Sequence, residues 1–140
     1  MTGIELGALL ADASQAAAYF IDVRDRAAVV EAATGLDFHI ATANLETVDD
    51  ADALLDEIAT ALELPPSSND DLEVLGRSLA DLSWLPAEGY LLLIDHCSDI
   101  RDAEPDAFAG LLASIDDAAR VHAARGVPFW AVLPVATPPA

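Results

Sequence analysis

Apolar residues recur at helical spacing in three long stretches of the chain, which predicts three amphipathic helices. The first stretch follows Asp49-Asp50 and ends before Pro65, a residue type that stops a helix. The second covers roughly residues 70–82, and the third leads from Pro105 to Gly126. The predicted buried faces consist, in chain order, of Ala51, Leu54, Leu55, Ile58 and Leu62; of Leu72, Leu75, Leu79 and Leu82; and of Phe108, Leu111, Leu112, Ile115, Ala119 and His122.

Shorter apolar runs predict four strands, at residues 19–23, 38–41 (continuing toward Asn44), 90–94 and 127–135. The third run, Tyr90–Ile94, is apolar without alternation, which is typical of a strand covered on both faces. After the first strand we expect a short helix that Asp25 caps and Gly35 closes, and residues 6–11 favour another short helix.

The predicted order of elements is therefore β-α-β-α-α-β-α-β. Strands that alternate with helices imply an α/β fold, with a mostly parallel sheet of about four strands covered by helices. A length of 140 residues, with 54% apolar residues and no linker or repeat, indicates one domain over residues 1–140.

Several features point to the cytoplasm. No apolar run is long enough to span a bilayer, and the N-terminus carries no basic region of the kind that opens a signal peptide. A single cysteine, Cys97, cannot form an internal disulfide, which fits a reducing compartment. We therefore expect no contact with a membrane.

Charge narrows the choice of partner. The chain has 25 acidic residues against 6 basic ones, all arginine, for a formal net charge of −19. Such a chain repels phosphate backbones, so nucleic acid is not expected as a partner, whereas a basic protein would be attracted. A salt-adapted or GC-rich genome produces the same balance, so charge alone does not establish a partner.

One segment carries residue types found in enzymes, namely Asp95-His96-Cys97-Ser98 after the third strand. The carboxyl ends of parallel strands are where ligands bind in such sheets. Neighbours along a strand point to opposite faces, however, so the segment is better explained as a strand end that turns into a polar loop. His39 and His122 show no metal-ligand spacing and are expected to be half-buried structural residues, and no cofactor or metal is predicted.

The most informative stretch is Leu64 to Leu82. Pro65 and Pro66 end the preceding helix, and any one of Ser67, Ser68 and Asn69 can cap the next. Its leucines form a buried face, while acidic side chains fill its first turn and its outer face. Asp70, Asp71 and Glu73 belong to that first turn, and Asp70, Glu73, Arg77 and Asp81 lie opposite the leucines with Val74 among them. Glu73 and Arg77 have the spacing of a surface ion pair.

This stretch, LPPSSNDDLEVLGRSLADLSWLP, together with the later GYLLLIDH and AARGVPFWAVL, resembles the barstar family of ribonuclease inhibitors. The resemblance runs from about Phe38 to Leu133, and the residues before it resemble an extension of longer bacterial members. It therefore implies that the single domain consists of an N-terminal strand-helix extension at residues 1–35 and a barstar-like core at residues 36–135. It implies a small parallel sheet with packed helices, in agreement with the pattern above. It also implies that the helix, with the loop before it, plugs the active site of a basic ribonuclease.

At several positions the chain departs from the pattern of that family. Ser67, Ser68 and Asn69 replace an aromatic pair and a glycine, and Asp71 replaces a common asparagine. Glu73 stands for the first inhibitory aspartate and Arg77 for the second, while Gly76 replaces a bulky aromatic residue. In the long helix Val121 stands at the position of an interface acid, with Asp117 the nearest acid.

These residues predict a non-enzymatic inhibitor or immunity protein that occludes the active site of a basic nuclease or other toxin with residues 67–82. The candidate partner-binding residues are Ser67, Ser68, Asn69, Asp70, Asp71, Glu73, Val74, Gly76, Arg77 and Asp81. Two alternatives stay open: an interaction module that no longer inhibits a ribonuclease, and a small enzyme that uses Asp95, His96 and Cys97. The glycine at position 76 favours close approach of another surface, although neutral drift from an aromatic residue would leave the same glycine.

Overall fold

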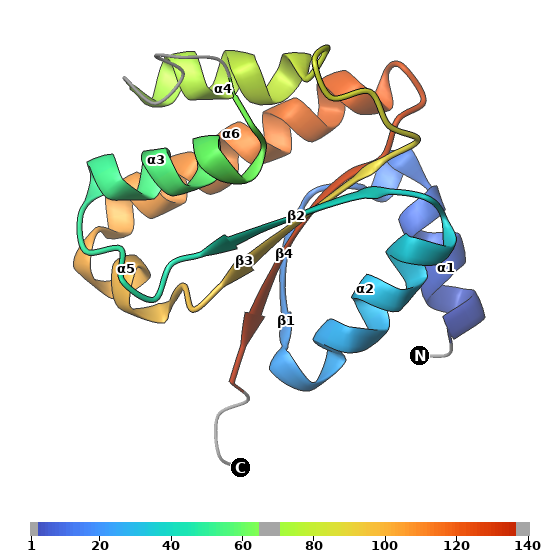
Figure 1. Cartoon of the computed structure of the whole chain (residues 1–140), viewed down its shortest axis with the longest axis horizontal. Coiled ribbons are helices and arrows are strands. Elements are labelled where there is room, and N and C mark those ends of the chain that lie inside the picture. The colour runs from blue at the N-terminus through green and yellow to red at the C-terminus, as the bar shows by residue number, and fades with distance from the viewer. Residues whose placement is uncertain (1–2, 65–70, 137–140) are drawn as a thin grey trace.

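The computed structural model describes residues 3–64 and 71–136. Four parallel strands form one sheet in the order β1-β4-β3-β2 (Figure 1). Their bounds are β1 (Ala18–Asp22), β2 (His39–Asn44), β3 (Tyr90–Asp95) and β4 (Phe129–Val135). The predicted α/β class is thereby confirmed, and the sheet, expected to be mostly parallel, is parallel throughout. Strands β3 and β4 lie inside the sheet and β1 and β2 at its edges.

Helices cover both faces of this sheet, so the molecule has three layers. One face carries α3 (Ala51–Ala61), α4 (Leu72–Asp81), α5 (Ser98–Ala103) and α6 (Pro105–Ala123). The other face carries α1 (Gly3–Ala11) and α2 (Arg26–Gly35), drawn in blue and cyan in Figure 1. Helix α4 packs mainly on α6 and to a smaller extent on α3, so it forms the outer rim of its layer.

The apolar run of β3 supplies both hydrophobic cores. Leu92 and Ile94 point into the larger core beneath α3, α4 and α6, whereas Leu91 and Leu93 point into the smaller core beneath α1 and α2. Successive strand residues face opposite sides of a sheet, so a strand buried on both sides must be apolar throughout. The interpretation of Tyr90–Ile94 as such a strand is confirmed.

Local signals set most helix ends as predicted. The Asp50 carboxylate accepts a 2.7 Å hydrogen bond from the Ala53 N–H and so caps α3. Pro105 occupies the first turn of α6, and after that helix Gly126 adopts the left-handed conformation with φ +75°. Glycine adopts this backbone conformation without steric penalty, which is why the chain can turn there into β4.

Of two predictions about the N-terminal half, the Asp25 cap is wrong, whereas the helix does end at Gly35. Asp25 precedes α2, but its side chain makes no capping bond; Asp22 instead accepts from the Arg24 N–H and caps the short 3-10 turn between β1 and α2. Gly35 is the last helical residue, and the left-handed residue after the helix is Asp37, with φ 58°. Aspartate tolerates this conformation better than most residues, so the helix can end without a glycine there.

A further helix, α5, was not predicted. The segment expected to be a polar loop continues into Ser98–Ala103, where the Arg101 N–H donates to the Cys97 carbonyl at 3.0 Å. Ile100 is completely buried and anchors this short helix to the larger core. A six-residue helix with one buried apolar residue has too short a pattern to be recognised from periodicity.

Candidate functional site

Helix α4 begins at Leu72, two residues later than the sequence suggested. Asp71 has an extended backbone, and its carboxylate accepts a 2.8 Å hydrogen bond from the Val74 N–H. Asp71 is therefore the N-cap rather than a first-turn residue, and the prediction that Ser67, Ser68 or Asn69 caps this helix is wrong. A short carboxylate next to the first free N–H groups is among the best caps available. Ser67, Ser68, Asn69 and Asp70 lie outside the described residues.

The two faces of α4 have opposite character, as predicted. Leu75 and Leu79 are completely buried and Leu82 is 1% exposed, whereas Leu72 is half-buried. Glu73, Arg77 and Asp81 are exposed and follow one another at four-residue spacing along the opposite side. We call these three residues, with the exposed cap Asp71 and the half-buried Val74, the outer face of α4.

The expected ion pair between Glu73 and Arg77 does not form in the part of the chain that the structure describes. Both side chains extend into solvent, where an ion pair gains little and orders two flexible chains. The guanidinium of Arg77 is thus presented beside carboxylates rather than held by one. This leaves a cation in the middle of an otherwise acidic row.

Gly76 lies on the flank of α4 that faces α6, not on the outer face. A Cβ atom at this position would lie 3.5 Å from the Ser114 Oγ and 3.6 Å from the Ser114 Cβ, which is ordinary contact. One turn earlier, a Cβ at Gly110 would come within 2.6 Å of the Leu72 Cδ2. Small residues on each helix thus let α4 and α6 approach closely, an explanation for Gly76 that the sequence did not suggest.

The C-terminal end of α4 is held by His122 of α6 and by Arg125, which follows that helix. His122 is 3% exposed, and its Nε2 lies 2.8 Å from the carbonyl oxygen of Leu79. Arg125 Nη1 lies 3.5 Å from the carbonyl oxygen of Ala80. The last carbonyls of a helix have no partner within it, and α4 has no basic residue in its own last turn. His122 near the end of α6 and Arg125 just after it therefore supply the donors that α4 lacks.

Burial keeps the His122 imidazole neutral. Desolvation is the main cause that lowers the pKa of His122, and the nearby charge of Arg125 lowers it further. The bond to Leu79 and the charge of Asp81 raise it, but by less. A neutral ring with its proton on Nε2 donates to the Leu79 carbonyl, and it stacks on Phe129 with ring centres 5.4 Å apart. His122 is thus more deeply buried than predicted and serves a structural role.

The residues considered for catalysis do not come together. Arg26 donates to both carboxylate oxygens of Asp95, at 3.0 and 2.8 Å. His96 is exposed, with a left-handed backbone at φ 57°, and Cys97 is 1% exposed. Burial raises the pKa of the Cys97 thiol, which disfavours the thiolate that a nucleophile requires. The geometry gives no support to an enzyme built on Asp95, His96 and Cys97.

Other residues considered for chemistry have ordinary surroundings. His39 is half-buried at the start of β2, as predicted. No group of three or more potential metal ligands occurs among residues 3–64 and 71–136. On α6, Asp117 is exposed and paired with Arg120 at 2.5 Å, and Val121 is 39% exposed. The position at which a family acid was expected thus presents an apolar side chain to solvent.

The fold has three layers, α/β/α, and α4 lies at the outer rim with both of its ends held by hydrogen bonds. It is thus a scaffold that displays one helix. The model of the family described as "Barstar (barnase inhibitor)" matches residues 38–134, and the chain belongs to this family. The resemblance seen in the sequence is thereby confirmed. Members of the family are typically inhibitors rather than enzymes. The match begins at β2, so β1, α1 and α2 lie before it.

Two further comparisons complete the picture. Among curated proteins none matches the chain significantly. Among solved structures, a chain in "Structure of Drosophila ORC bound to DNA" matches with a TM-score of 0.53 and 17% identity, over 96% of this chain and 36% of that chain. This protein thus spans about a third of the length of that chain, and the likeness shows the fold alone. In the described part, no helix is both long and apolar enough to cross a membrane.

Proposed function

We propose that this protein is a barstar-like inhibitor or immunity protein. It neutralises a basic nuclease or other toxin in the cytoplasm by laying α4 and the residues before it over the active site. Membership of the barstar family supports this role, and the net charge of −19 favours encounter with a basic partner. The proposed contact residues are those named from the sequence except Gly76, which faces α6: Ser67, Ser68, Asn69, Asp70, Asp71, Glu73, Val74, Arg77 and Asp81.

The observation that carries the proposal is the way α4 is displayed. Asp71 caps its start, buried Leu75 and Leu79 fix its inner side, and His122 holds its end. Since these contacts are made before any partner arrives, little ordering entropy is lost on binding. The outer face is thus presented as a rigid surface, which suits an inhibitor better than a flexible recognition segment.

Arg77 shifts the expected target away from a typical barnase-type ribonuclease. Such an enzyme binds RNA phosphates with a cationic pocket, which the family fills with carboxylates from this helix. Arg77 is exposed in the middle of the outer face and brings a cation instead. Like charges held at a desolvated contact cost several kcal/mol, so association would be weak. A cognate target should offer a carboxylate or another acceptor opposite Arg77.

The test is a titration of the full chain against a barnase-type ribonuclease in an RNA cleavage assay. We expect no inhibition at nanomolar concentrations by the wild type and a gain of inhibition with Arg77→Asp. The matched control is Arg24→Asp, which changes the net charge equally at a residue after β1, far from α4 in the fold. Inhibition gained by both variants would indicate long-range charge steering rather than a contact at α4.

Two outcomes count against parts of this proposal. Full inhibition by the wild type would show that Arg77 does not occupy the position of an inhibitory acid. If neither variant inhibits and no toxin encoded near this gene is captured by the protein, the alternative of an interaction module without ribonuclease inhibition is favoured. The observation that favours such an interaction module is the exposed Arg77 within the acidic outer face.

A further inference from the structure

Strand β1 forms an open edge of the sheet. The Ala131 N–H donates to the Ala17 carbonyl at 3.1 Å, so the backbone groups of Ala17 point toward β4. In a parallel ladder this direction alternates with each residue, and both groups of one residue point the same way. The N–H and C=O of Phe20 therefore point away from β4, to the side where the sheet has no further strand.

One end of this edge is already covered by the protein itself. The Ala18 N–H, which points the same way as that of Phe20, donates to the Asp116 carboxylate of α6 at 2.9 Å. The Phe20 N–H and C=O have no such partner among the described residues. An edge with free backbone groups is a template for a further strand.

Large apolar side chains gather along the same edge. In the described part of the chain five large apolar residues are exposed, and four of them lie on β1 or beside it: Leu9, Tyr19, Phe20 and Val23, at 36%, 44%, 45% and 50% exposure. Scattered exposed apolar residues need no explanation, but a cluster marks an interaction surface.

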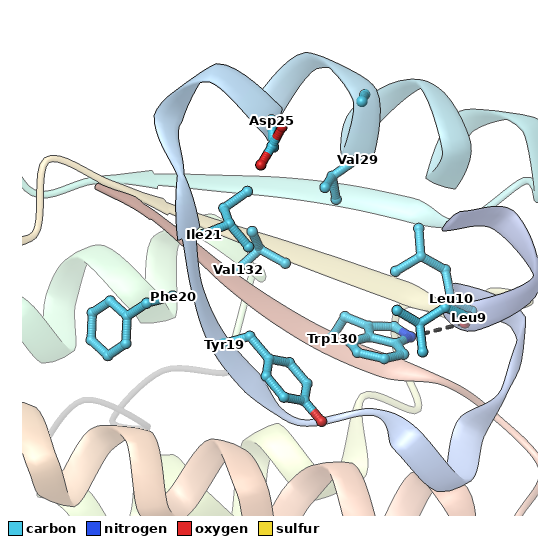
Figure 2. A pocket seen from close by; sticks show the side chains of 10 residues that line it. Leu9, Leu10, Tyr19, Phe20, Ile21, Asp25, Val29, Trp130 and Val132 are labelled. Atoms are coloured by element: carbon cyan, nitrogen blue, oxygen red, sulfur yellow. Dashed lines mark hydrogen bonds between the residues drawn. The ribbon is translucent and has the colours of Figure 1, made fainter. Parts of the chain in front are cut away.

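This cluster borders a pocket of about 440 Å³ on the face of the sheet opposite α4 (Figure 2). Trp130 forms its floor; its Nε1 donates to the Leu10 carbonyl at 2.9 Å, and its ring lies 5.5 Å from that of Tyr19. The pocket is lined by Tyr19 and Ile21, which point to this face, and by Phe20 between them on the edge strand. The Phe20 ring turns to the other face, where it lies 6.4 Å from the Phe108 ring and 5.4 Å from the Arg101 guanidinium carbon. The pocket thus reaches β1 at the edge of the sheet.

Among the residues that the structure describes, Asp25 is the only charged one that lines this pocket. Its carboxylate is exposed, makes no capping bond to α2 and forms no salt bridge within the described residues. A carboxylate at the mouth of an apolar pocket favours a ligand in which a cation follows an apolar group. The net charge of −19 likewise favours a basic ligand, and it disfavours a second copy of this chain because two such chains repel each other.

We propose that the edge of β1 and this pocket bind an extended segment of a partner protein that alternates apolar and basic residues. The segment adds a fifth strand beside β1 through the Phe20 backbone, places one apolar side chain over Trp130, and sets a lysine or arginine opposite Asp25. Helix α4 lies on the other side of the sheet, so this binding site is independent of the proposed inhibitory surface (Figure 1).

The probe is a blocked synthetic heptapeptide, Lys-Ile-Lys-Phe-Lys-Ile-Lys, added to the full chain; the control peptide carries glutamate at each lysine. Binding is followed by calorimetry and by the amide NMR signals of β1. We expect the lysine peptide to bind, more weakly as salt rises, and the glutamate peptide not to bind. Asp25→Asn should weaken binding about two- to fivefold, as for the loss of one exposed ion pair. Asp81→Asn, the same charge change on α4, should have no effect.

The backbone contact is tested separately from the side chain. Phe20→Ala keeps the outward N–H, whereas Phe20→Pro removes it without touching the ladder to β4, so only the proline variant should abolish binding. Because proline can also destabilise the fold, a second test leaves the protein unchanged. One peptide is N-methylated at its odd-numbered residues and another at its even-numbered residues. We expect only one of the two to bind, because only alternate backbone N–H groups of the added strand face β1.

Several results would overturn this proposal, and none depends on ribonuclease inhibition. The first is absence of binding by the lysine peptide, and the second is equal binding of the lysine and glutamate peptides. The third is undiminished binding of both N-methylated peptides. Dimerisation of the wild type that Phe20→Pro abolishes, seen by sedimentation, would show that a second copy and not a basic partner occupies the edge.

Discussion

The imidazole of His122 on α6 lies 2.8 Å from the carbonyl oxygen of Leu79 on α4, 43 positions earlier in the sequence. This bond joins the displayed helix to the longest helix of the fold at the point where α4 runs out of internal partners. It is buried on every side, against Phe129 and Tyr90 among others. The position of the outer face of α4 thus depends on a side chain far away in the sequence.

The first prediction concerns pH. The pKa of His122 is lowered in the folded protein below its ordinary value of about 6.5. Above that value both folded and unfolded chains hold a neutral imidazole, and its contribution to stability is fully present. As pH falls below 6.5 the unfolded chain binds the proton first, so stability is lost until pH has passed the lowered folded pKa. His122→Gln keeps an N–H donor that does not titrate.

Urea denaturation of both proteins between pH 8 and pH 4.5 provides the check. The difference in free energy of unfolding between wild type and His122→Gln should be constant above pH 6.5 and shift against the wild type below it. Comparison of the two proteins cancels the contributions of the other titrating groups. A difference that does not change with pH would show that His122 titrates alike in the folded and unfolded chains.

The second prediction contrasts two glycines. Gly76→Ala should stabilise the protein by about 0.5–1 kcal/mol, because the added methyl group meets Ser114 at ordinary distance and alanine favours helix. Gly89→Ala should instead destabilise it by about 1–3 kcal/mol, because the new methyl group would overlap the Phe38 ring. Thermal melts of both variants test this. Loss of stability in Gly76→Ala would mean that α4 and α6 are closer than described.

The third prediction concerns the two faces of α4. Leu75→Ala should destabilise the fold by about 2–5 kcal/mol, because Leu75 is completely buried in the larger core. Glu73→Ala, on the exposed outer face, should change the free energy of unfolding by about 0.5 kcal/mol or less. Equal shifts of the denaturation midpoint would contradict the assignment of the faces. The expected result makes Glu73→Ala suitable for binding studies.

The fourth prediction concerns the pair of Arg26 and Asp95, which joins the start of α2 to the end of β3. A double-mutant cycle with Arg26→Gln and Asp95→Asn should give a coupling of about 1 kcal/mol or less, since the Arg26 side chain is 36% exposed and solvent screens the pair. Urea denaturation at low and high salt measures it, and the coupling should decrease with salt. A coupling of zero would remove Arg26 as a link between the N-terminal elements and the core.

Much of the fold was accessible from local patterns. The helical spacing of Leu75 and Leu79 and the unbroken apolar run of β3 each fixed one element and its buried side. The family resemblance was likewise carried by contiguous residues, 38–134. Two kinds of prediction were wrong. Helix α5 was missed because it is only six residues long. The cap of α4 was misassigned because several neighbouring residues could cap it, and Asp71 rather than an earlier residue does so.

Periodicity and charge are local properties of the chain, so they were enough to predict a mostly parallel α/β fold, the buried side of each main helix and the acidic character of the outer face of α4. Only the tertiary structure decided that Gly76 faces Ser114, that His122 caps α4, that Asp95 is held by Arg26, and that β1 leaves an apolar edge open. Each of these depends on which distant segments lie side by side. Many sequence positions satisfy the same local pattern, and packing alone chooses the partner.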